Sequence, residues 1–175
     1  MESIKHPIAK ELQDVPLEEL LKRRVARFSE IEADWDAFAD SRNEGTRRAQ
    51  FRFIGAGGSG KHDGKSIHAG GFTFSIMQVP PGQGGSSHTH EIEEAFFVLK
   101  GELTVFFERD GRRVSTVLKP WEIVSCPAGI PHGFRNDGNE DVYMQTMIGS
   151  GRPGPVGYVN DQIYEEEQRR LASRR

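Results

Sequence analysis

The alternation of apolar and polar positions along this chain is strongest from Gln50 onward. There, short apolar runs are separated by clusters of Gly, Pro, Asn and Asp, without helical patterns between them. This spacing is typical of an all-β sandwich or barrel, because each run can form a strand and each cluster a turn. Arg109-Asp110-Gly111 is a strong hairpin signal, since glycine readily adopts the positive φ angle of tight hairpins. The expected strands are residues 50–54, 71–79, 94–99, 103–109, 113–118, 122–126, 133–136 and 142–148.

Helical patterns lie at the two ends of the chain. Residues 14–24 predict a short helix that Asp14 caps, with acidic side chains in its first turn and basic ones in its last. Residues 25–31 either extend this helix or form a strand, and residues 34–42 predict another short helix. A C-terminal helix is expected over residues 161–173, with Asp161 as its cap. The predicted organisation is an N-terminal extension, a barrel and a helical tail, namely residues 1–49, 50–150 and 151–175.

The overall composition limits the class of protein. The chain has 175 residues, enough for one domain, and its net charge of -3 lacks the basic excess of a nucleic-acid-binding protein. Cys126 is the single cysteine, which excludes an intrachain disulfide and favours a reducing compartment. No stretch approaches the roughly 20 apolar residues that span a bilayer, and the polar N-terminus has no signal-peptide core. We therefore expect a soluble cytoplasmic protein without a nucleic-acid or membrane partner.

Three side chains that can bind a metal ion lie close together in the sequence: His88, His90 and Glu94. On one unbulged strand they would share a face, because alternate residues of an extended chain point the same way. His132, just after the Pro-rich turn at 127–131, supplies a fourth candidate. Imidazole and carboxylate ligands suit Zn, Mn, Fe, Ni or Co, and four of them leave positions open on an octahedral metal, as in catalytic sites. From the spacing alone, a metal site and exposed histidines in a loop are equally good interpretations.

The two segments resemble the paired motifs of the cupin superfamily over roughly residues 70–150. The fixed positions of the first motif correspond to Gly82, His88, His90, Glu94 and Gly101, and those of the second to Pro127, Gly129, His132 and Asn136. Trp121 stands where the second motif starts with glycine, which puts the tight turn before that strand in question. The resemblance implies a double-stranded β-helix, the jelly-roll cupin barrel, with short terminal helices. It also implies that His88, His90, Glu94 and His132 bind one divalent metal ion per chain.

Strand alternation predicts which side chains face the barrel interior. Counting from Glu94, the side chains of Phe96 and Val98 point inward, and those of Ala95, Phe97 and Leu99 point outward. An outward face this apolar should be covered by residues 1–49 or by a partner subunit, and since small cupins commonly dimerise, we expect a homodimer. Two alternating sets share the last strand, and one of them faces the cavity: Tyr143, Gln145 and Met147, or Val142, Met144 and Thr146. Gln145 is a candidate substrate contact or an ordinary packing residue.

A glycine-rich segment, Gly55-Ala-Gly57-Gly-Ser-Gly60, fits part of a phosphate-binding loop. Such a loop needs Ser or Thr after its lysine and a helix behind it, but Lys61 is followed by His62 and a turn-rich stretch. A flexible loop over the barrel mouth is therefore the better interpretation.

The cupin resemblance fixes no single function, because this fold carries many. The complete ligand set favours a metal-dependent enzyme, foremost a dioxygenase-type oxidoreductase that acts on a small organic substrate. Glu94 is then the candidate catalytic residue, either as a permanent ligand or as a base. The alternatives are a non-catalytic small-molecule-binding or storage cupin and a metal-dependent isomerase or lyase. No further cofactor is expected.

Overall fold

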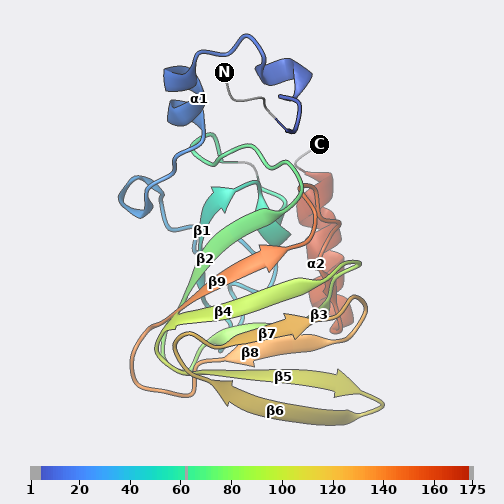
Figure 1. Cartoon of the computed structure of the whole chain (residues 1–175). Coiled ribbons are helices and arrows are strands. Elements are labelled where there is room, and N and C mark those ends of the chain that lie inside the picture. The colour runs from blue at the N-terminus through green and yellow to red at the C-terminus, as the bar shows by residue number, and fades with distance from the viewer. Residues whose placement is uncertain (1–4, 62, 174–175) are drawn as a thin grey trace.

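Two five-stranded antiparallel sheets face each other as a jelly roll (Figure 1). The computed structural model describes residues 5–61 and 63–173. One sheet has the strand order β1-β2-β9-β4-β7 and the other β10-β3-β8-β5-β6. This arrangement confirms the predicted all-β barrel with short terminal helices.

The strands follow the predicted pattern closely where a run is apolar. They are β1 (Ala49–Ile54), β2 (Thr73–Val79), β3 (Gly84–Thr89), β4 (Glu94–Lys100), β5 (Leu103–Arg109), β6 (Arg112–Leu118), β7 (Ile123–Cys126), β8 (His132–Arg135), β9 (Val142–Ile148) and β10 (Gly157–Tyr158). Two of them, β3 and β10, were not predicted. β3 has the sequence GGSSHT, which lacks large apolar residues, and β10 has only two residues.

The helical elements correct several predictions. They are α1 (Leu17–Arg23), α2 (Asp161–Ala172) and the 3-10 helices η1 (Lys10–Leu12), η2 (Phe28–Glu30) and η3 (Gly57–Ser59). α1 begins after Pro16 without a side-chain cap, so Asp14 does not cap it. Asn160, not Asp161, caps α2, since its Oδ1 atom accepts a hydrogen bond from the Ile163 amide at 3.1 Å.

The segment between η2 and β1 was predicted as a helix over residues 34–42, but it forms turns instead. Asp34 pairs with Gln50 as an isolated antiparallel bridge, with both backbone hydrogen bonds at 3.0 Å. The segment is thereby joined to the first sheet. No helix in the described part of the chain is long and apolar enough to cross a membrane. The cytoplasmic location stays a prediction.

The core between the sheets forms as strand alternation predicts. Phe96 and Val98 of β4 are buried with Leu103, Met144 and other apolar side chains, and the Phe96 and Phe134 rings meet edge-to-face with centroids 5.2 Å apart. Burying these side chains is the main contribution to stability. The sheets are thus held at a fixed separation, on which the geometry of the site depends.

The outward side of the first sheet is covered in part. Leu99 packs against a second apolar cluster that includes Ile31 of the N-terminal segment and Phe51 of β1, and Phe28 of η2 lies on Phe51 with ring centroids 4.6 Å apart. Phe97 instead contacts the Trp121 ring, and Trp121 is 75% exposed. The N-terminal segment therefore covers one part of this face and leaves the β7 edge open.

Two tight turns show how non-glycine residues adopt positive φ angles. In the β5–β6 hairpin, Asp110 and Gly111 have φ angles of 54° and 73°, as the hairpin prediction requires. Trp121 has a φ of 74° in the turn before β7, where the cupin motif has glycine. The turn is kept, because the Trp121 amide donates to Val98 O at 2.9 Å and the Glu122 amide to Lys119 O at 3.1 Å. The missing glycine therefore leaves the strand entry intact, at the expense of local backbone strain.

Candidate metal centre

The four candidate ligands come from both sheets of the barrel, not from one strand as predicted for the first three. His88 lies on β3 and His90 follows it, whereas Glu94 begins β4 in the opposite sheet. His132 begins β8, directly across from His88 in the antiparallel pair of β3 and β8. The chain therefore crosses between the sheets at residues 91–93, and the Glu94 side chain meets the histidines from the facing wall.

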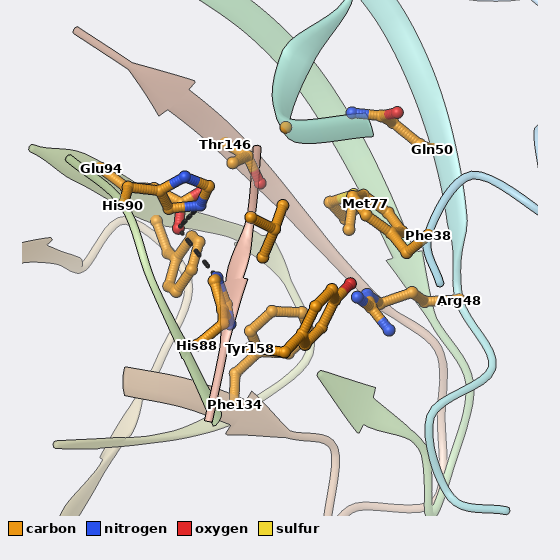
Figure 2. Close-up of a pocket in the computed structure, with 13 residues that line it drawn as sticks. Phe38, Arg48, Gln50, Met77, His88, His90, Glu94, Phe134, Thr146 and Tyr158 are labelled. Carbon is orange, nitrogen blue, oxygen red and sulfur yellow. Dashed lines mark hydrogen bonds and ion pairs between the residues drawn. The ribbon is translucent and has the colours of Figure 1, made fainter. Parts of the chain in front are cut away.

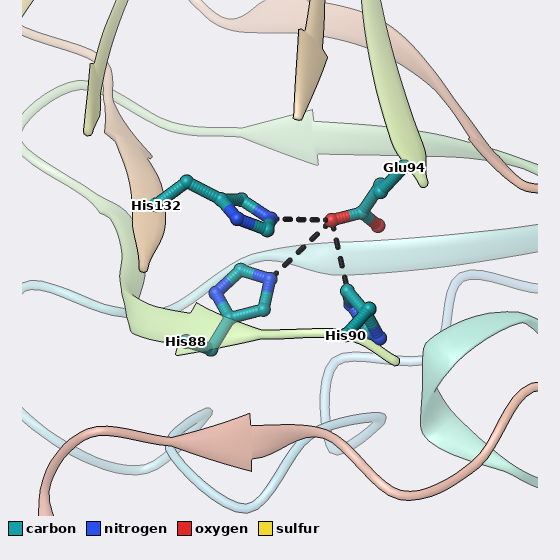
Figure 3. A group of neighbouring side chains, drawn as sticks. All are labelled: His88, His90, Glu94 and His132. Atoms are coloured by element: carbon teal, nitrogen blue, oxygen red, sulfur yellow. Dashed lines mark hydrogen bonds and ion pairs between the residues drawn. The ribbon is translucent and has the colours of Figure 1, made fainter. Parts of the chain in front are cut away.

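The four side chains converge on one point (Figure 3). Glu94 Oε2 lies 3.0 Å from His132 Nε2 and 3.4 Å from both His88 Nε2 and His90 Nε2. One donor atom from each side chain lies within 4.8 Å of every other, and all four residues are buried. This is the spacing at which a single cation can be shared.

Backbone carbonyls fix the orientation of two of the imidazole rings. His88 Nδ1 lies 2.8 Å from Ser86 O, and His132 Nδ1 lies 2.7 Å from Ile130 O. In each neutral ring the Nδ1–H donates to the carbonyl, so Nε2 carries the lone pair. These lone pairs face a carboxylate oxygen that is also an acceptor, an arrangement that a bound cation or an extra proton must satisfy. The donor set therefore fits a metal ion.

The buried charges of the cluster shift one another's pKa values. Burial raises the pKa of Glu94. When protons rather than a cation lie between these groups, however, the His90 charge and hydrogen bonds from the imidazoles outweigh burial and hold that pKa well below its usual value. Burial lowers the pKa of His88. The Glu94 carboxylate overcomes the effect of burial at His90, where the pKa is raised. Glu94 is therefore ionised at neutral pH and supplies a negative charge to the site.

A small cavity adjoins the cluster on the side of β1, β9 and β10 (Figure 2). Its lining combines aromatic and apolar side chains with the polar side chains of Arg48, Gln50 and Thr146. Tyr158 stands between His88 and Arg48, with its ring centroid 6.1 Å from that of His88. The barrel interior thus offers enclosed space beside the candidate ligands.

The glycine-rich segment lies at one side of this cavity. It was predicted as a flexible loop over the barrel mouth, but Gly57–Ser59 form the 3-10 helix η3. Gly57 has a φ of 61°, and a side chain there would come within 2.4 Å of Gln50 Nε2. Gly58 lines the cavity and lies beside His90. Ser59 accepts hydrogen bonds from the buried Arg52 guanidinium, which also pairs with Asp34 at 2.7 Å. The segment is therefore a fixed roof from Gly57 to Ser59; His62 lies outside the described residues.

The sequence analysis did not identify the polar residues that line the cavity. It named Gln145 instead of the adjacent Thr146. Gln145 was the candidate for substrate contact, but Thr146 lines the cavity and Gln145 points to the other face of β9. Arg48 and Gln50 had no recognisable motif. Cys126 is buried, and burial raises the pKa of its thiol, which agrees with a packing role.

The model of the Cupin domain family matches residues 75–148 of the chain. These residues hold β2 to β9 with all four candidate ligands, so this part of the chain is similar to a cupin domain. No curated protein matches the chain significantly.

Solved structures share the fold at low sequence identity. A polyketide cyclase, RemF of Streptomyces resistomycificus, has a TM-score of 0.58 and 21% identity, covering 82% of this chain and 92% of its own. An oxalate oxidase has a TM-score of 0.55 and 21% identity over 77% of this chain and 62% of its own. Vicilin of hazelnut, Corylus avellana, has a TM-score of 0.54 and 17% identity over 78% of this chain and 36% of its own. This chain thus spans less than two thirds of that oxalate oxidase, and the likeness establishes the double-stranded β-helix fold.

Proposed function

We propose that this chain, whose residues 75–148 match the model of the Cupin domain family, is a metal-dependent enzyme with dioxygenase-type oxidoreductase activity on a small organic substrate. The observation that carries the proposal is the buried convergence of three imidazoles and one ionised carboxylate beside an enclosed cavity. His88, His90, Glu94 and His132 would hold the ion. When bound, a redox-active metal with open positions would activate dioxygen and polarise an oxygen atom of the substrate.

The protein's own part in such a reaction is orientation and exclusion of water. Ser86 O and Ile130 O fix the His88 and His132 rings, so their Nε2 lone pairs stay aimed at the same point. Phe96 lies against His132 with ring centroids 5.9 Å apart and against Phe134 with centroids 5.2 Å apart, so apolar rings pack behind the ligands. A dry site strengthens each electrostatic interaction within it. We assign Glu94 the role of an anionic ligand. The alternative is that it also accepts a proton, and the Glu94→Gln variant discussed below distinguishes the two roles.

The competing functions are a non-catalytic binding or storage cupin and a metal-dependent isomerase or lyase. The shared fold does not decide among them, because relatives as different as a polyketide cyclase, an oxalate oxidase and a vicilin have it. The enzyme is favoured because the ligand set is complete and a cavity adjoins it.

Oxygen dependence separates these functions. The protein, loaded in turn with Fe²⁺, Mn²⁺, Ni²⁺, Co²⁺ and Zn²⁺, would be incubated with small hydroxy acids, diketones and phenols under ¹⁸O₂. We expect ¹⁸O in a product, or oxygen uptake, with at least one redox-active metal and none with Zn²⁺. Substrate conversion of equal rate without oxygen would instead identify an isomerase or lyase. Stoichiometric metal with no conversion of any compound would favour the binding protein.

We further propose that the chain forms a homodimer through the open β7 edge of the first sheet. Ile123 is 59% exposed beside the exposed Trp121, and Phe97 lies opposite Ile123 in the pair of β4 and β7. Sedimentation velocity at micromolar concentration should show a dimer, and Ile123→Lys should shift it to monomer. Val159→Lys, which alters an exposed apolar residue elsewhere, is the control. A wild-type monomer would contradict the proposal.

A further inference from the structure

The first histidine of the candidate metal centre is oriented by a backbone carbonyl in an irregular part of its strand. His88 Nδ1 lies 2.8 Å from Ser86 O, so the position of this carbonyl determines where the ring points. The pairing of β3 with β8 shifts its register between Gly85 and His88. On the other side of β3, the pairing with β10 covers only His88 and Thr89. Contacts other than the two strand ladders must therefore hold Ser86 in place.

A buried carboxylate from the segment before β1 makes such a contact. Asp40 is 0% exposed, and its Oδ2 atom accepts a hydrogen bond from the Ser86 amide at 3.0 Å. Its Oδ1 atom accepts from Arg48 Nη2 at 2.9 Å and from the Tyr158 hydroxyl at 3.2 Å. Arg48 Nη1 in turn donates to Gly84 O at 3.2 Å. Asp40 and Arg48, which we call the clamp, thus hold the β3 backbone at two residues close before His88.

The clamp is itself held firmly. Arg48 is 3% exposed, and its guanidinium carbon lies 4.3 Å from the centroid of the Phe38 ring. Its Nη1 atom also donates to Thr46 O at 2.9 Å. Hydrogen bonds between ionised groups are strong in a buried place, and loss of either partner would leave the other charge uncompensated. The clamp therefore keeps one arrangement and imposes it on β3.

The second ligand whose ring is oriented by a carbonyl is held in a different way. His132 Nδ1 lies 2.7 Å from Ile130 O, and the Ile130 amide donates to Pro127 O at 3.2 Å within the turn before β8. Pro127 and Pro131 restrict the φ angles of this turn. Ile130 O is thus fixed by its own turn, whereas Ser86 O is fixed from a residue 46 positions away in the chain. A change in the clamp should affect His88 and spare His132.

We propose that Asp40 and Arg48 are positioning residues of the metal centre, which fix Ser86 and thereby orient His88 for metal binding. Neither residue belongs to the cluster of ligands, so their effect passes through the backbone of β3. Both precede residues 75–148, the part that matches the Cupin domain family, so the N-terminal segment has a role in the site. The inference rests on the metal centre of the proposed function and is independent of the reaction catalysed there.

Asp40→Asn tests the clamp, because it keeps the side-chain volume and removes the charge and one of the two acceptor oxygens. Zinc affinity of the folded full chain, measured by competition with a chelator, should fall about 10-fold, as for other groups that orient a ligand. Asp36→Asn is the matched control, since Asp36 lies in the same segment and pairs with the exposed Arg42. It should keep the wild-type affinity.

A double variant keeps the test valid if Asp40→Asn does not fold. Asp40→Ala/Arg48→Met removes both charges together, which a protein tolerates better than the loss of one partner of a buried pair. It should also bind zinc about 10-fold more weakly than the wild type, because nothing then holds the Ser86 amide.

A spectroscopic signal separates positioning from a general loss of stability. In zinc-loaded protein with ¹⁵N-labelled histidine, the Nδ1–H groups of His88 and His132 report on their hydrogen bonds to the two carbonyls. In the clamp variants the His88 signal should shift or broaden, and the His132 signal should stay. Val142→Ala is the control for stability, because Val142 is fully buried and pairs with Val79 at the end of β9 far from Glu94. It should lower the melting temperature and change neither the signals nor the zinc affinity.

The outcomes distinguish this inference from the metal centre itself. Wild-type zinc affinity or an unchanged His88 signal in the folded clamp variants would overturn the inference and leave the metal centre standing. Equal shifts of the His88 and His132 signals would overturn it as well, because they would show a general change of the barrel. A wild-type chain that binds no zinc would refute the metal centre, and this inference with it.

Discussion

Replacing His132 with alanine is expected to abolish stoichiometric metal binding while the barrel stays folded. His132 Nε2 lies 3.0 Å from Glu94 Oε2 and belongs to the facing sheet, so its loss opens one side of the site. Even groups that only orient a ligand change metal affinity by about 10- to 100-fold, and we expect at least 100-fold for a direct ligand. The fold should persist because the core between the sheets rests on side chains such as Phe96, Val98 and Leu103.

Metal content and thermal melting, measured on the same samples, check this expectation. The wild type should carry about one Zn²⁺ per chain and melt roughly 8–16 °C higher at a thousandfold excess of zinc over Kd, because binding to the folded state stabilises it by about 4 kcal/mol. His132→Ala should show neither effect and keep the wild-type circular dichroism spectrum. His88→Ala should behave alike.

His68→Ala provides the matched control, because His68 is an exposed histidine outside the cluster. It should retain the full zinc content and the full thermal shift. If His132→Ala or His88→Ala also kept stoichiometric metal, that residue would have to be removed from the ligand set. Loss of the folded spectrum before any metal is added would show a structural role instead.

The local part of the site could be predicted from the sequence, and the tertiary part could not. His88, His90, Glu94 and His132 were found by their spacing and by the cupin resemblance, and the structure brings all four together. Their placement on a single strand was wrong, since the glycine-rich polar segment of β3 has no apolar alternation to mark it. The turn at residues 91–93, which carries the chain to the other sheet, was therefore overlooked.

The facing of β9 illustrates a second limit. The interior side of β4 followed from Glu94, because a ligand residue anchored the alternation within that strand. β9 has no such anchor, and its two faces looked equivalent in sequence. The antiparallel pair of Phe96 with Thr146 settles the question, because directly paired residues of neighbouring strands point to the same face. The register between strands depends on the tertiary structure, so the sequence alone could not show that Thr146, and not Gln145, faces the cavity.

Arg48 shows a third limit, since its role depends on contacts distant in sequence. Asp40 holds its guanidinium, and Tyr158 of β10 donates to the same carboxylate at 3.2 Å. These three residues come from the segment before β1 and from the C-terminal strand, which the sequence pattern assigned to parts outside the barrel. The cavity wall is thus built partly by the flanking segments.

Glu94→Gln is expected to reduce activity far more than stability. The side-chain volume hardly changes, so no packing defect follows, although Glu94 is only 4% exposed. The substitution removes the one negative charge from a set of otherwise neutral ligands, and a neutral amide oxygen is a weaker donor to a divalent ion. Glu93→Gln is the control, because Glu93 is exposed on the opposite side and accepts a hydrogen bond from Ser125.

Excess metal then separates the two roles that Glu94 can have. If Glu94 is only a ligand, titration calorimetry will show weaker metal binding, and saturating metal will restore much of the turnover. If Glu94 also accepts a proton, saturation will not restore it, since an amide cannot take that proton at neutral pH. The three imidazoles, which all lie within 3.4 Å of Glu94 Oε2, should retain some metal in either case. If Glu94→Gln bound the metal as tightly as Glu93→Gln and the wild type do, both roles would be contradicted. A carboxylate at the centre of the cluster cannot lose its charge without changing the binding of a cation there.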